Sequence, residues 1–279
     1  MTTTDEGLDA RYDYARTIAL EAARMGMEYY RNRSGLTIEH KGSDRQDMVS
    51  IADKRLEEFI RSRLAERFPE DGFVGEEGGT LDLQACCLWV IDPIDGTACF
   101  LNGLHNWCVS IGLAIAGEPV IGVIADPNHD ELFHGCRGRG AFVNDTPLRV
   151  SEATHVSQGL LGTGTFHKEG KHHFIPFLER LLAEGGMFFR NGSGALTTAY
   201  VAAGRLIGYY ETHLKSWDCL AGLVLVKEAG GLANDFLAGD GLLQGNPYLV
   251  ACPGVYAQVE ALIGPSIRIG QPERIRRNS

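Results

Sequence analysis

The 279-residue sequence predicts a mixed α/β fold composed of two unlike halves. Before about residue 150, two segments with apolar residues at helical spacing precede a run of short segments typical of an antiparallel meander. From about Ser151, strands and helices alternate, which indicates an α/β unit whose ligands bind at strand ends. We therefore expect an N-terminal α+β half over residues 1–150 and a C-terminal α/β half over residues 151–279.

The N-terminal half begins with two amphipathic helices. Leu8–Tyr30 and Asp53–Phe68 both carry apolar side chains at intervals of three and four residues, the spacing of one helix face. The apolar run Leu88–Ile91 has the length of a covered strand. Strands of the meander, the last of them a hairpin, are expected at Trp107–Ala116, Pro119–Ala125, Glu131–His134 and Ala141–Val150.

The C-terminal half alternates between the two kinds of element. Strands are expected at Leu160–Gly162, Met187–Arg190, Ile207–Glu211, Leu232 and Leu249. Helices are expected near His173–Ala183, at Leu196–Ala203 and from Ser216 to the glycines 230 and 231.

Charge and composition exclude several classes of protein. The formal net charge of −10 argues against nucleic acid and against an anionic membrane surface as partners. No apolar run approaches the roughly 20 residues of a membrane span, and the polar start Met1–Glu6 is unlike a signal peptide. The seven cysteines include no C-x-x-C pair, which is typical of reduced, buried thiols. We therefore expect a cytoplasmic protein.

The segment Trp89–Thr97, with the sequence Trp-Val-Ile-Asp-Pro-Ile-Asp-Gly-Thr, carries the most chemistry. A covered strand runs into a turn at the proline and the glycine, which places Asp92 and Asp95 at the end of the strand. Two carboxylates this close repel each other unless a cation lies between them. A solvated, Asp-rich turn is the alternative, but the apolar strand before it and the Gly-Thr after it favour a metal–phosphate site.

Other segments supply further acids. Val74–Gly79 contains Glu76 and Glu77 between glycines. Because neighbours on an extended segment point in opposite directions, only one of them faces the site, and we expect Glu76. Asp53 and Asp218 each lie near the start of a predicted helix, so either could serve only as a helix cap.

Together the Gly-Glu-Glu turn, the strand-terminal Asp-Pro-Ile-Asp-Gly-Thr and the later Trp-Asp-Cys-Leu-Ala-Gly resemble the inositol monophosphatase family. The order and the intervals match from Lys41 to Gly231. The resemblance implies a layered αβαβα sandwich of the inositol monophosphatase and fructose-1,6-bisphosphatase type. It also implies a homodimer and Mg²⁺-dependent, Li⁺-sensitive hydrolysis of a small phosphate monoester.

The resemblance further implies two or three Mg²⁺ ions. Glu76, Asp92 and the backbone carbonyl of Ile94 are expected to hold a first ion, and Asp92, Asp95 and Asp218 a second. All of these groups offer the oxygen ligands that Mg²⁺ prefers. Asp92 would bridge the two ions.

The same resemblance assigns the reacting water and the phosphate. Glu76 and a hydrogen-bonded pair of Thr97 and Asp53 are expected to orient and deprotonate the water. Backbone N–H groups of Gly96 and Thr97 are expected to receive phosphate oxygens. Phosphoryl transfer depends mainly on positioning and charge neutralisation, so no covalent protein nucleophile is expected.

The leaving alcohol is assigned to a second set of residues. In the family a glutamate placed like Glu211 contacts hydroxyls of the leaving group, although a surface carboxylate at a strand end is the alternative. Ser193 and Gly194 belong to Arg-Asn-Gly-Ser-Gly-Ala, which resembles the family's Arg-x-Gly-Ser-Ala-Ala turn with Gly194 in place of alanine. Asp95 and Asp218 are also expected to contact the substrate.

One departure from the family pattern leaves the substrate open. The family usually has Thr-Asn after Asp-Gly-Thr, whereas this chain has Ala98-Cys99. Inositol 1- or 4-monophosphate is the first expectation; histidinol phosphate, or a sugar or nucleotide phosphate, is the second. Lys41 resembles a family lysine near the metals, but a solvated loop lysine fits equally well. A binding protein without activity is disfavoured, because all five acids expected of an active site are present.

Overall fold

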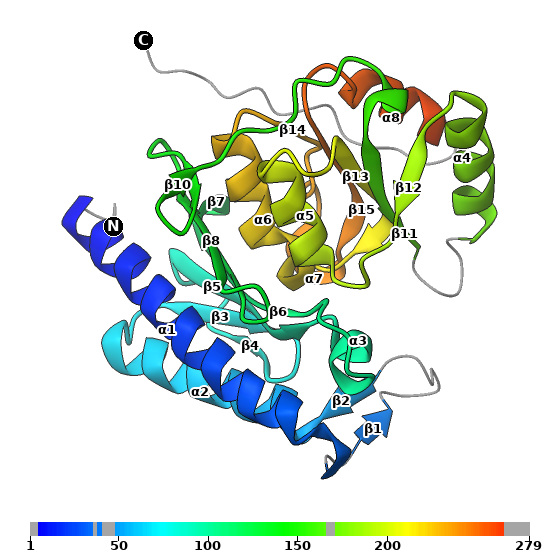
Figure 1. Cartoon of the computed structure of the whole chain (residues 1–279). Helices are drawn as coiled ribbons and strands as arrows, with labels where there is room; N and C mark the ends of the chain where they lie inside the picture. The colour runs from blue at the N-terminus through cyan, green and yellow to red at the C-terminus, as the bar shows by residue number, and fades with distance from the viewer. Residues whose placement is uncertain (1–4, 36–37, 41–47, 166–170, 265–279) are drawn as a thin grey trace.

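A computed structural model describes residues 5–35, 38–40, 48–165 and 171–264 (Figure 1). Helices α1 (Asp5–Arg31) and α2 (Ile51–Arg67) cover one face of an eight-stranded sheet, and α5 (Gly194–Ala202) and α6 (Ser216–Glu228) pack on the other face. A five-stranded sheet lies beyond α5 and α6, and α8 (Tyr256–Ile263) packs on its far side together with α4 (Lys171–Ala183). The layers therefore run helix, sheet, helix, sheet, helix, as the sequence resemblance implied.

The larger sheet has the strand order β10-β9-β8-β7-β6-β5-β3-β4. All of its neighbours pair antiparallel except β3 and β5, which run parallel. Its strands are β3 (Gly72–Gly75), β4 (Gly79–Leu81), β5 (Cys87–Asp95), β6 (Cys108–Ile115), β7 (Glu118–Asp126), β8 (Glu131–Cys136), β9 (Ala141–Val143) and β10 (Thr146–Pro147).

The smaller sheet has the order β12-β11-β13-β15-β14. Its strands are β11 (Leu160–Gly164), β12 (Met187–Phe189), β13 (Gly208–Leu214), β14 (Leu232–Ala233) and β15 (Asn246–Ala251). β12, β11 and β13 are parallel, whereas β15 runs antiparallel to β13 and β14. The remaining elements are α3 (Thr97–Leu101), α4 (Lys171–Ala183), α7 (Gly241–Gln244), the hairpin strands β1 (Ile38–His40) and β2 (Met48–Ser50), and two 3₁₀ turns at Arg33–Gly35 and Val156–Gln158.

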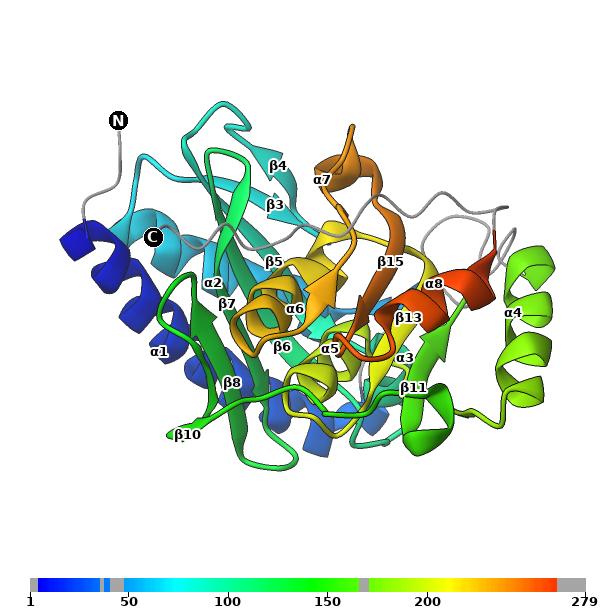
Figure 2. The same ribbon diagram turned by 90° about the horizontal axis from the view of Figure 1, so that it is seen from above.

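The middle helix layer has no solvent-facing stripe. Every residue of α6 from Cys219 to Val226 is buried, because the helix is covered by a sheet on each side (Figure 2). The backbone of α6 approaches β7 so closely that a Cβ at Gly122 would lie 2.1 Å from the Ala221 carbonyl oxygen. This close approach is what brings the start of α6, with Asp218, against the end of β5.

The predicted helices and strands of both halves are present, with small shifts at their ends. The helix expected from Leu196 begins at Gly194, because the hydroxyl of Ser193 caps it by accepting from the N–H of Leu196. Sequence reasoning did not predict β1 to β4, α3, α7 or α8. Most of these are too short to show a hydrophobic period, and their pairing partners lie elsewhere in the chain.

The larger sheet is built from residues 72–147 and the smaller from residues 160–251. The division of the chain near residue 150 into two domains stays a prediction, since the two sheets share one helix layer. Among the residues that the structure describes, no helix combines the length and the apolarity that crossing a bilayer requires.

Candidate active site

The end of β5 presents two of the predicted acids together. Asp92 pairs with Ser110 and Asp95 with Cys108, and the register of β5 on β6 shifts between the two pairs. Residues three apart on a regular strand point to opposite faces, so this irregularity re-aims one of the two carboxylates. Asp92 also accepts a hydrogen bond from the N–H of Ile94 (3.0 Å) within this irregular stretch. The expected turn at Pro93 is wrong, because β5 continues through the proline to Asp95 and the chain turns only at Gly96.

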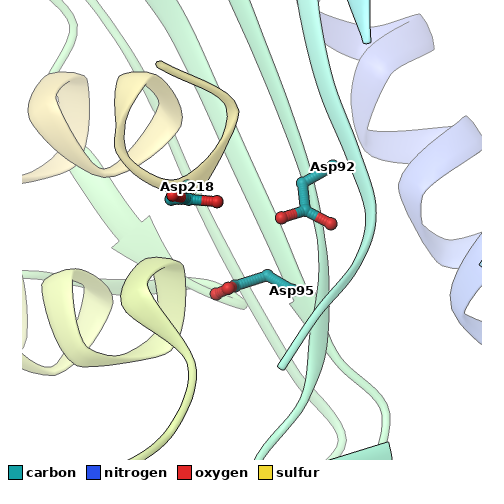
Figure 3. A group of neighbouring side chains, drawn as sticks. All are labelled: Asp92, Asp95 and Asp218. Atoms are coloured by element: carbon teal, nitrogen blue, oxygen red, sulfur yellow. The ribbon is translucent and has the colours of Figure 1, made fainter. Parts of the chain in front are cut away.

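Asp218 completes a group of three carboxylates. Asp92, Asp95 and Asp218 each have an oxygen within 4.8 Å of the others, and the first two side chains are buried (Figure 3). Burial raises the pKa of all three carboxyl groups, and their mutual repulsion raises the pKa of Asp92 and Asp218 further.

Asp95 is held by the N-terminus of α5. Its carboxylate accepts hydrogen bonds from the hydroxyl of Ser193 (2.5 Å) and from the backbone N–H groups of Ala195 (2.6 Å) and Gly194 (3.2 Å). These bonds lower the pKa of Asp95 against the effect of burial. Ser193 and Gly194 thus contact a proposed metal ligand, a role that their sequence motif did not indicate.

Asp218 is the third residue of α6, and Lys215 occupies the cap position. The Asp218 carboxylate accepts from the backbone N–H of Lys215 (3.0 Å) and so also stabilises the start of the helix. The two alternatives for Asp218, helix cap and site residue, are therefore compatible, because one oxygen serves the helix while the carboxylate lies beside Asp95.

Asp53 of α2 contacts Thr97, the first residue of α3 after the end of β5. Thr97 Oγ1 lies 3.2 Å from Asp53 Oδ1 and 3.1 Å from the Ile94 carbonyl oxygen. Asp53 Oδ2 accepts from both the N–H (2.8 Å) and the hydroxyl (2.6 Å) of Ser50, in a capping box at the start of α2. Burial raises the pKa of Asp53, against the opposing effect of these hydrogen bonds.

Ser50 was missed by sequence reasoning, although the pattern Ser-x-x-Asp before an apolar run is a known signal for a capping box. Its two bonds to Asp53 Oδ2 leave the other carboxylate oxygen directed at Thr97.

The two glutamates of the Gly-Glu-Glu turn lie in different surroundings. The charge of Glu76 raises the pKa of both Asp92 and Asp218, so its carboxylate lies on the side of the three aspartates. Glu77 instead lines a surface hollow together with Lys54 and Arg61 of α2. Lys41, the other residue whose role was open, lies outside the described residues.

A polar cavity of about 180 Å³ adjoins the three aspartates and holds most of the predicted leaving-group contacts. Predicted residues that line it are Asp95, Ser193, Gly194, Glu211 and Asp218. The cavity is also lined by Arg190, Asn191 and Gly192 of the Arg-Asn-Gly-Ser-Gly-Ala turn, and by residues that were not predicted: Thr163, Gly164, Thr197, Tyr209 and Leu214. Gly96 and Thr97 are not among the described residues that line this cavity.

Glu211 lies inside this cavity rather than on the surface. Its carboxylate accepts a hydrogen bond from the hydroxyl of Tyr209 (2.5 Å), the second residue before it on β13. Burial raises the pKa of Glu211 to about 7, partly offset by the Tyr209 bond. Glu211 therefore changes its charge near neutral pH.

The donor set fits a hard divalent cation. Three carboxylates that are crowded, largely buried and mutually repelling are stabilised when a cation neutralises them, and oxygen ligands suit Mg²⁺. Glu76 adds a fourth carboxylate on the same side. Cys108 also lies near Asp95, but burial raises the pKa of its thiol well above the ordinary value, which disfavours the thiolate form.

Comparisons with known proteins agree with this geometry. The model of the inositol monophosphatase family matches residues 8–265. An inositol-1-monophosphatase of Mesorhizobium japonicum is 40% identical over 228 residues, which cover 81% of this chain and 85% of that protein. A Nus factor SuhB of Xylella fastidiosa is 41% identical over 198 residues, which cover 70% of this chain and 72% of that protein.

The fold comparison leads to the same family. The crystal structure of the extragenic suppressor protein suhB from Bartonella henselae superimposes with a TM-score of 0.86 and 33% identity, over 92% of this chain and 100% of that chain. The chain therefore belongs to the inositol monophosphatase family, and it is a phosphoric monoester hydrolase.

Proposed function

We propose that the protein hydrolyses small phosphate monoesters with Mg²⁺ as cofactor and that an inositol monophosphate is its preferred substrate. The observation that carries this proposal is the group Asp92, Asp95 and Asp218, two members of which also line the cavity that contains Glu211. Metal-binding acids and a polar pocket for a small alcohol are thus adjacent.

Glu76, Asp92 and the Ile94 carbonyl are proposed to hold one Mg²⁺, and Asp92, Asp95 and Asp218 a second, with two or three ions in all. Asp92 would serve both ions, which is supported by its central position: each of the other four acids of the site raises the pKa of Asp92. Bound in this way, Mg²⁺ lowers the pKa of water and neutralises charge on the phosphate.

Thr97 and Asp53, together with Glu76, are proposed to orient the attacking water and accept its proton. A hydroxyl has one donor and two acceptor positions, so Thr97 can donate to Asp53 and still accept from water. The raised pKa of Asp53 brings it closer to the range in which a carboxylate can take up a proton near neutral pH. Backbone N–H groups of Gly96 and Thr97 are proposed to bind the phosphate oxygens.

The leaving alcohol is proposed to occupy the cavity beside Glu211, Ser193 and Gly194. Ionised Glu211 accepts hydrogen bonds from hydroxyls, and the Tyr209 hydroxyl holds its carboxylate in one orientation. This polar environment favours a polyol over an apolar alcohol.

The test is phosphate release by the purified protein with Mg²⁺, with and without Li⁺. The panel contains inositol 1-phosphate, histidinol phosphate, fructose 1,6-bisphosphate and 3′-phosphoadenosine 5′-phosphate. The Asp92→Asn variant is the blank, and Asp13→Asn, an exposed carboxylate on α1, is the matched control. We expect inositol 1-phosphate to be hydrolysed with the highest kcat/KM and Li⁺ to inhibit.

Preference for another ester would move the substrate assignment to that compound and make Ala98-Cys99 the first candidates for the switch. No Mg²⁺-dependent release from any ester would contradict the proposed activity and favour a binding role.

A homodimer is also proposed. β12 is an edge strand of the smaller sheet and exposes Met187 and Phe188, and the neighbouring α4 exposes Ile175 and Leu182. Exposed apolar side chains on a strand edge promote pairing unless another surface covers them. Sedimentation should show a dimer that Met187→Lys weakens; a monomer at every concentration would contradict this.

A cytoplasmic location is proposed from the thiols. All seven cysteines are free, and six of them are buried. Free thiols are typical of reducing compartments. Cell fractionation with an epitope-tagged chain checks the location.

A further inference from the structure

A buried glutamate of α2 lies beneath the turn that carries Glu76. Glu57 has 2% of its surface exposed, and its carboxylate accepts hydrogen bonds from the backbone N–H groups of Glu77 (2.7 Å) and Gly78 (2.6 Å). Arg61, one helical turn further, donates to the same carboxylate (3.2 Å). Successive N–H groups aimed at one point form a site for an anion, and here the protein supplies that anion itself.

The two glycines of the turn make room for this carboxylate. A Cβ at Gly75 would lie 2.3 Å from Glu57 Oε1, and a Cβ at Gly78 would lie 2.4 Å from the same atom. Any side chain at these positions would displace Glu57 or the turn. The two glycines of the turn are therefore explained by contact with Glu57 and, at Gly78, also with Arg61.

Glu76 is fixed by the backbone on each side of its side chain. Its own N–H bonds to the Ile91 carbonyl (3.3 Å) on β5, and the next N–H, that of Glu77, bonds to Glu57. The first bond ties the turn to the strand that carries Asp92. The second ties it to α2, where Asp53 lies one helical turn before Glu57.

We propose that Glu57 is a positioning residue for the metal site, which holds the Gly75–Gly78 turn so that the Glu76 carboxylate faces Asp92. This role rests on the proposed function, because it concerns the affinity for Mg²⁺. Glu57 acts through the backbone of the turn, because its carboxylate accepts from two backbone N–H groups of the turn and from Arg61. Groups that orient metal ligands in this way affect metal affinity strongly.

The first test compares Glu57→Gln with Glu58→Gln. Glu58 is the next residue on the same helix, and its carboxylate is exposed and paired only with Arg55 among its described contacts. Both changes remove one negative charge, but only the first replaces one of the two oxygens that accept an N–H of the turn with an NH₂ group, which cannot accept. The readouts are the Mg²⁺ dissociation constant from titration calorimetry, the Mg²⁺ dependence of kcat and KM, and the melting curve.

We expect Glu57→Gln to weaken Mg²⁺ binding roughly 10- to 100-fold, which is typical when an outer partner of a ligand is lost. Its kcat should fall at limiting Mg²⁺ and recover towards the wild-type value at high Mg²⁺. The melting curve without Mg²⁺ shows whether the variant is folded at the assay temperature, so that the recovery reports metal affinity and not refolding by mass action. Glu58→Gln should bind Mg²⁺ like the wild type.

The second test uses the contact at Gly75, so that the role can be checked even if Glu57→Gln folds poorly. Gly75→Ala places a methyl group against the Glu57 carboxylate and should weaken Mg²⁺ binding. In Glu57→Ala the space is vacated, so the same methyl group should then cost much less. A double-mutant cycle measures this coupling.

The outcomes separate two failures. If the wild type binds Mg²⁺ and Glu57→Gln binds it equally well, or if Gly75→Ala leaves the affinity unchanged, the positioning role is wrong while the proposed function stands. If the wild type itself shows no Mg²⁺ binding and no Mg²⁺-dependent hydrolysis, the proposed function fails and the role of Glu57 fails with it.

Discussion

Thr97 and Asp53 are joined across the site by a hydrogen bond of 3.2 Å, although 44 positions separate them in the chain. Thr97 opens the short helix after β5, and Asp53 lies in the first turn of α2. The bond therefore connects the loop that follows the two aspartates of β5 to a helix on the far face of the same sheet. A proton taken from water at Thr97 would have a carboxylate to receive it.

This connection predicts different effects for two substitutions at Thr97. Thr97→Ser keeps the hydroxyl, and we expect kcat to stay within about tenfold of the wild type. Thr97→Val keeps the shape but removes the donor, and kcat should fall by roughly 10²- to 10⁴-fold, the usual contribution of a proton-transferring group. Steady-state hydrolysis of inositol 1-phosphate measures both. Equal activities of the Val and Ser variants would exclude Thr97 from the proton path.

Asp92→Asn should abolish turnover while the fold persists. Burial and the four neighbouring acids raise the pKa of Asp92, so its ionised form destabilises the metal-free protein. The stability lost on ionising Asp92 increases as pH rises towards the raised pKa. Asparagine does not ionise, so the variant does not lose this stability. We therefore expect the metal-free variant to melt at least as high as the wild type, with the difference largest at alkaline pH.

The same variant should also respond less to Mg²⁺. Mg²⁺ that binds only the folded state raises the melting temperature of the wild type by mass action. Asp92→Asn should lose most of this increase, whereas Asp13→Asn, an exposed carboxylate, should keep it. Differential scanning calorimetry with and without Mg²⁺ measures the shifts; an unchanged response in Asp92→Asn would contradict the bridging assignment.

Glu211 should make stability depend on pH in a defined window. Its pKa is raised from 4.5 to about 7, chiefly by burial, so the folded state binds a proton that the unfolded state has released between these values. The contribution of Glu211 to stability is full below pH 4.5 and is lost as pH rises through 7. Glu211→Gln lacks this loss, so its free energy of unfolding relative to the wild type should rise between pH 5 and pH 8. Urea titrations of the metal-free proteins at the two pH values check this; a constant difference would contradict it.

Glu211→Ala should change the choice of substrate more than the chemistry. The side chain lies in the cavity proposed for the leaving alcohol, away from the Thr97–Asp53 pair. We expect kcat/KM for inositol 1-phosphate to fall more than kcat/KM for an aryl phosphate, which has no hydroxyls for Glu211 to bind. Parallel assays of the two esters decide this, and an equal loss on both would place Glu211 outside the leaving-group pocket.

Gly96→Ala should destabilise the protein more than Gly117→Ala does. Both glycines have positive φ, +94° and +83°, and a residue with a Cβ in this region costs about 1–2 kcal/mol. A Cβ at Gly96 would also lie 2.5 Å from the Asn106 carbonyl oxygen, whereas one at Gly117 meets no atom within 4 Å. The difference between the two free energies of unfolding measures the clash. Equal losses would mean that the loop after β5 relaxes to admit a methyl group.

Much of the fold could be predicted from the sequence because long helices and strands have recognisable local patterns of apolar residues. The helices α1 and α2 carry apolar residues at helical spacing, and β6, β7 and β8 are apolar runs of strand length separated by turns, so a single window of sequence reveals each of them. The short strands β3 and β4 and the five-residue helix α3 carry none, and they exist only because the sheet and the turn around them supply the partners.

The candidate site was likewise predictable in part from the sequence. The identity and order of the acids, from Asp53 through Glu76, Asp92 and Asp95 to Asp218, are written in the sequence, because oxygen ligands for a cation must be present as residue types. The sequence alone left open whether Glu76 or Glu77 faces inward and whether Glu211 is buried. It contained no sign that Glu57 lies beneath the turn.

The tertiary structure decided those points. The register shift in β5, the contact of Asp95 with the start of α5 and the approach of α2 to the Gly-Glu-Glu-Gly turn each join segments that are remote in sequence. A side chain's direction, burial and partners depend on how separate elements pack, and that packing is set by the whole core rather than by the residues of any one motif.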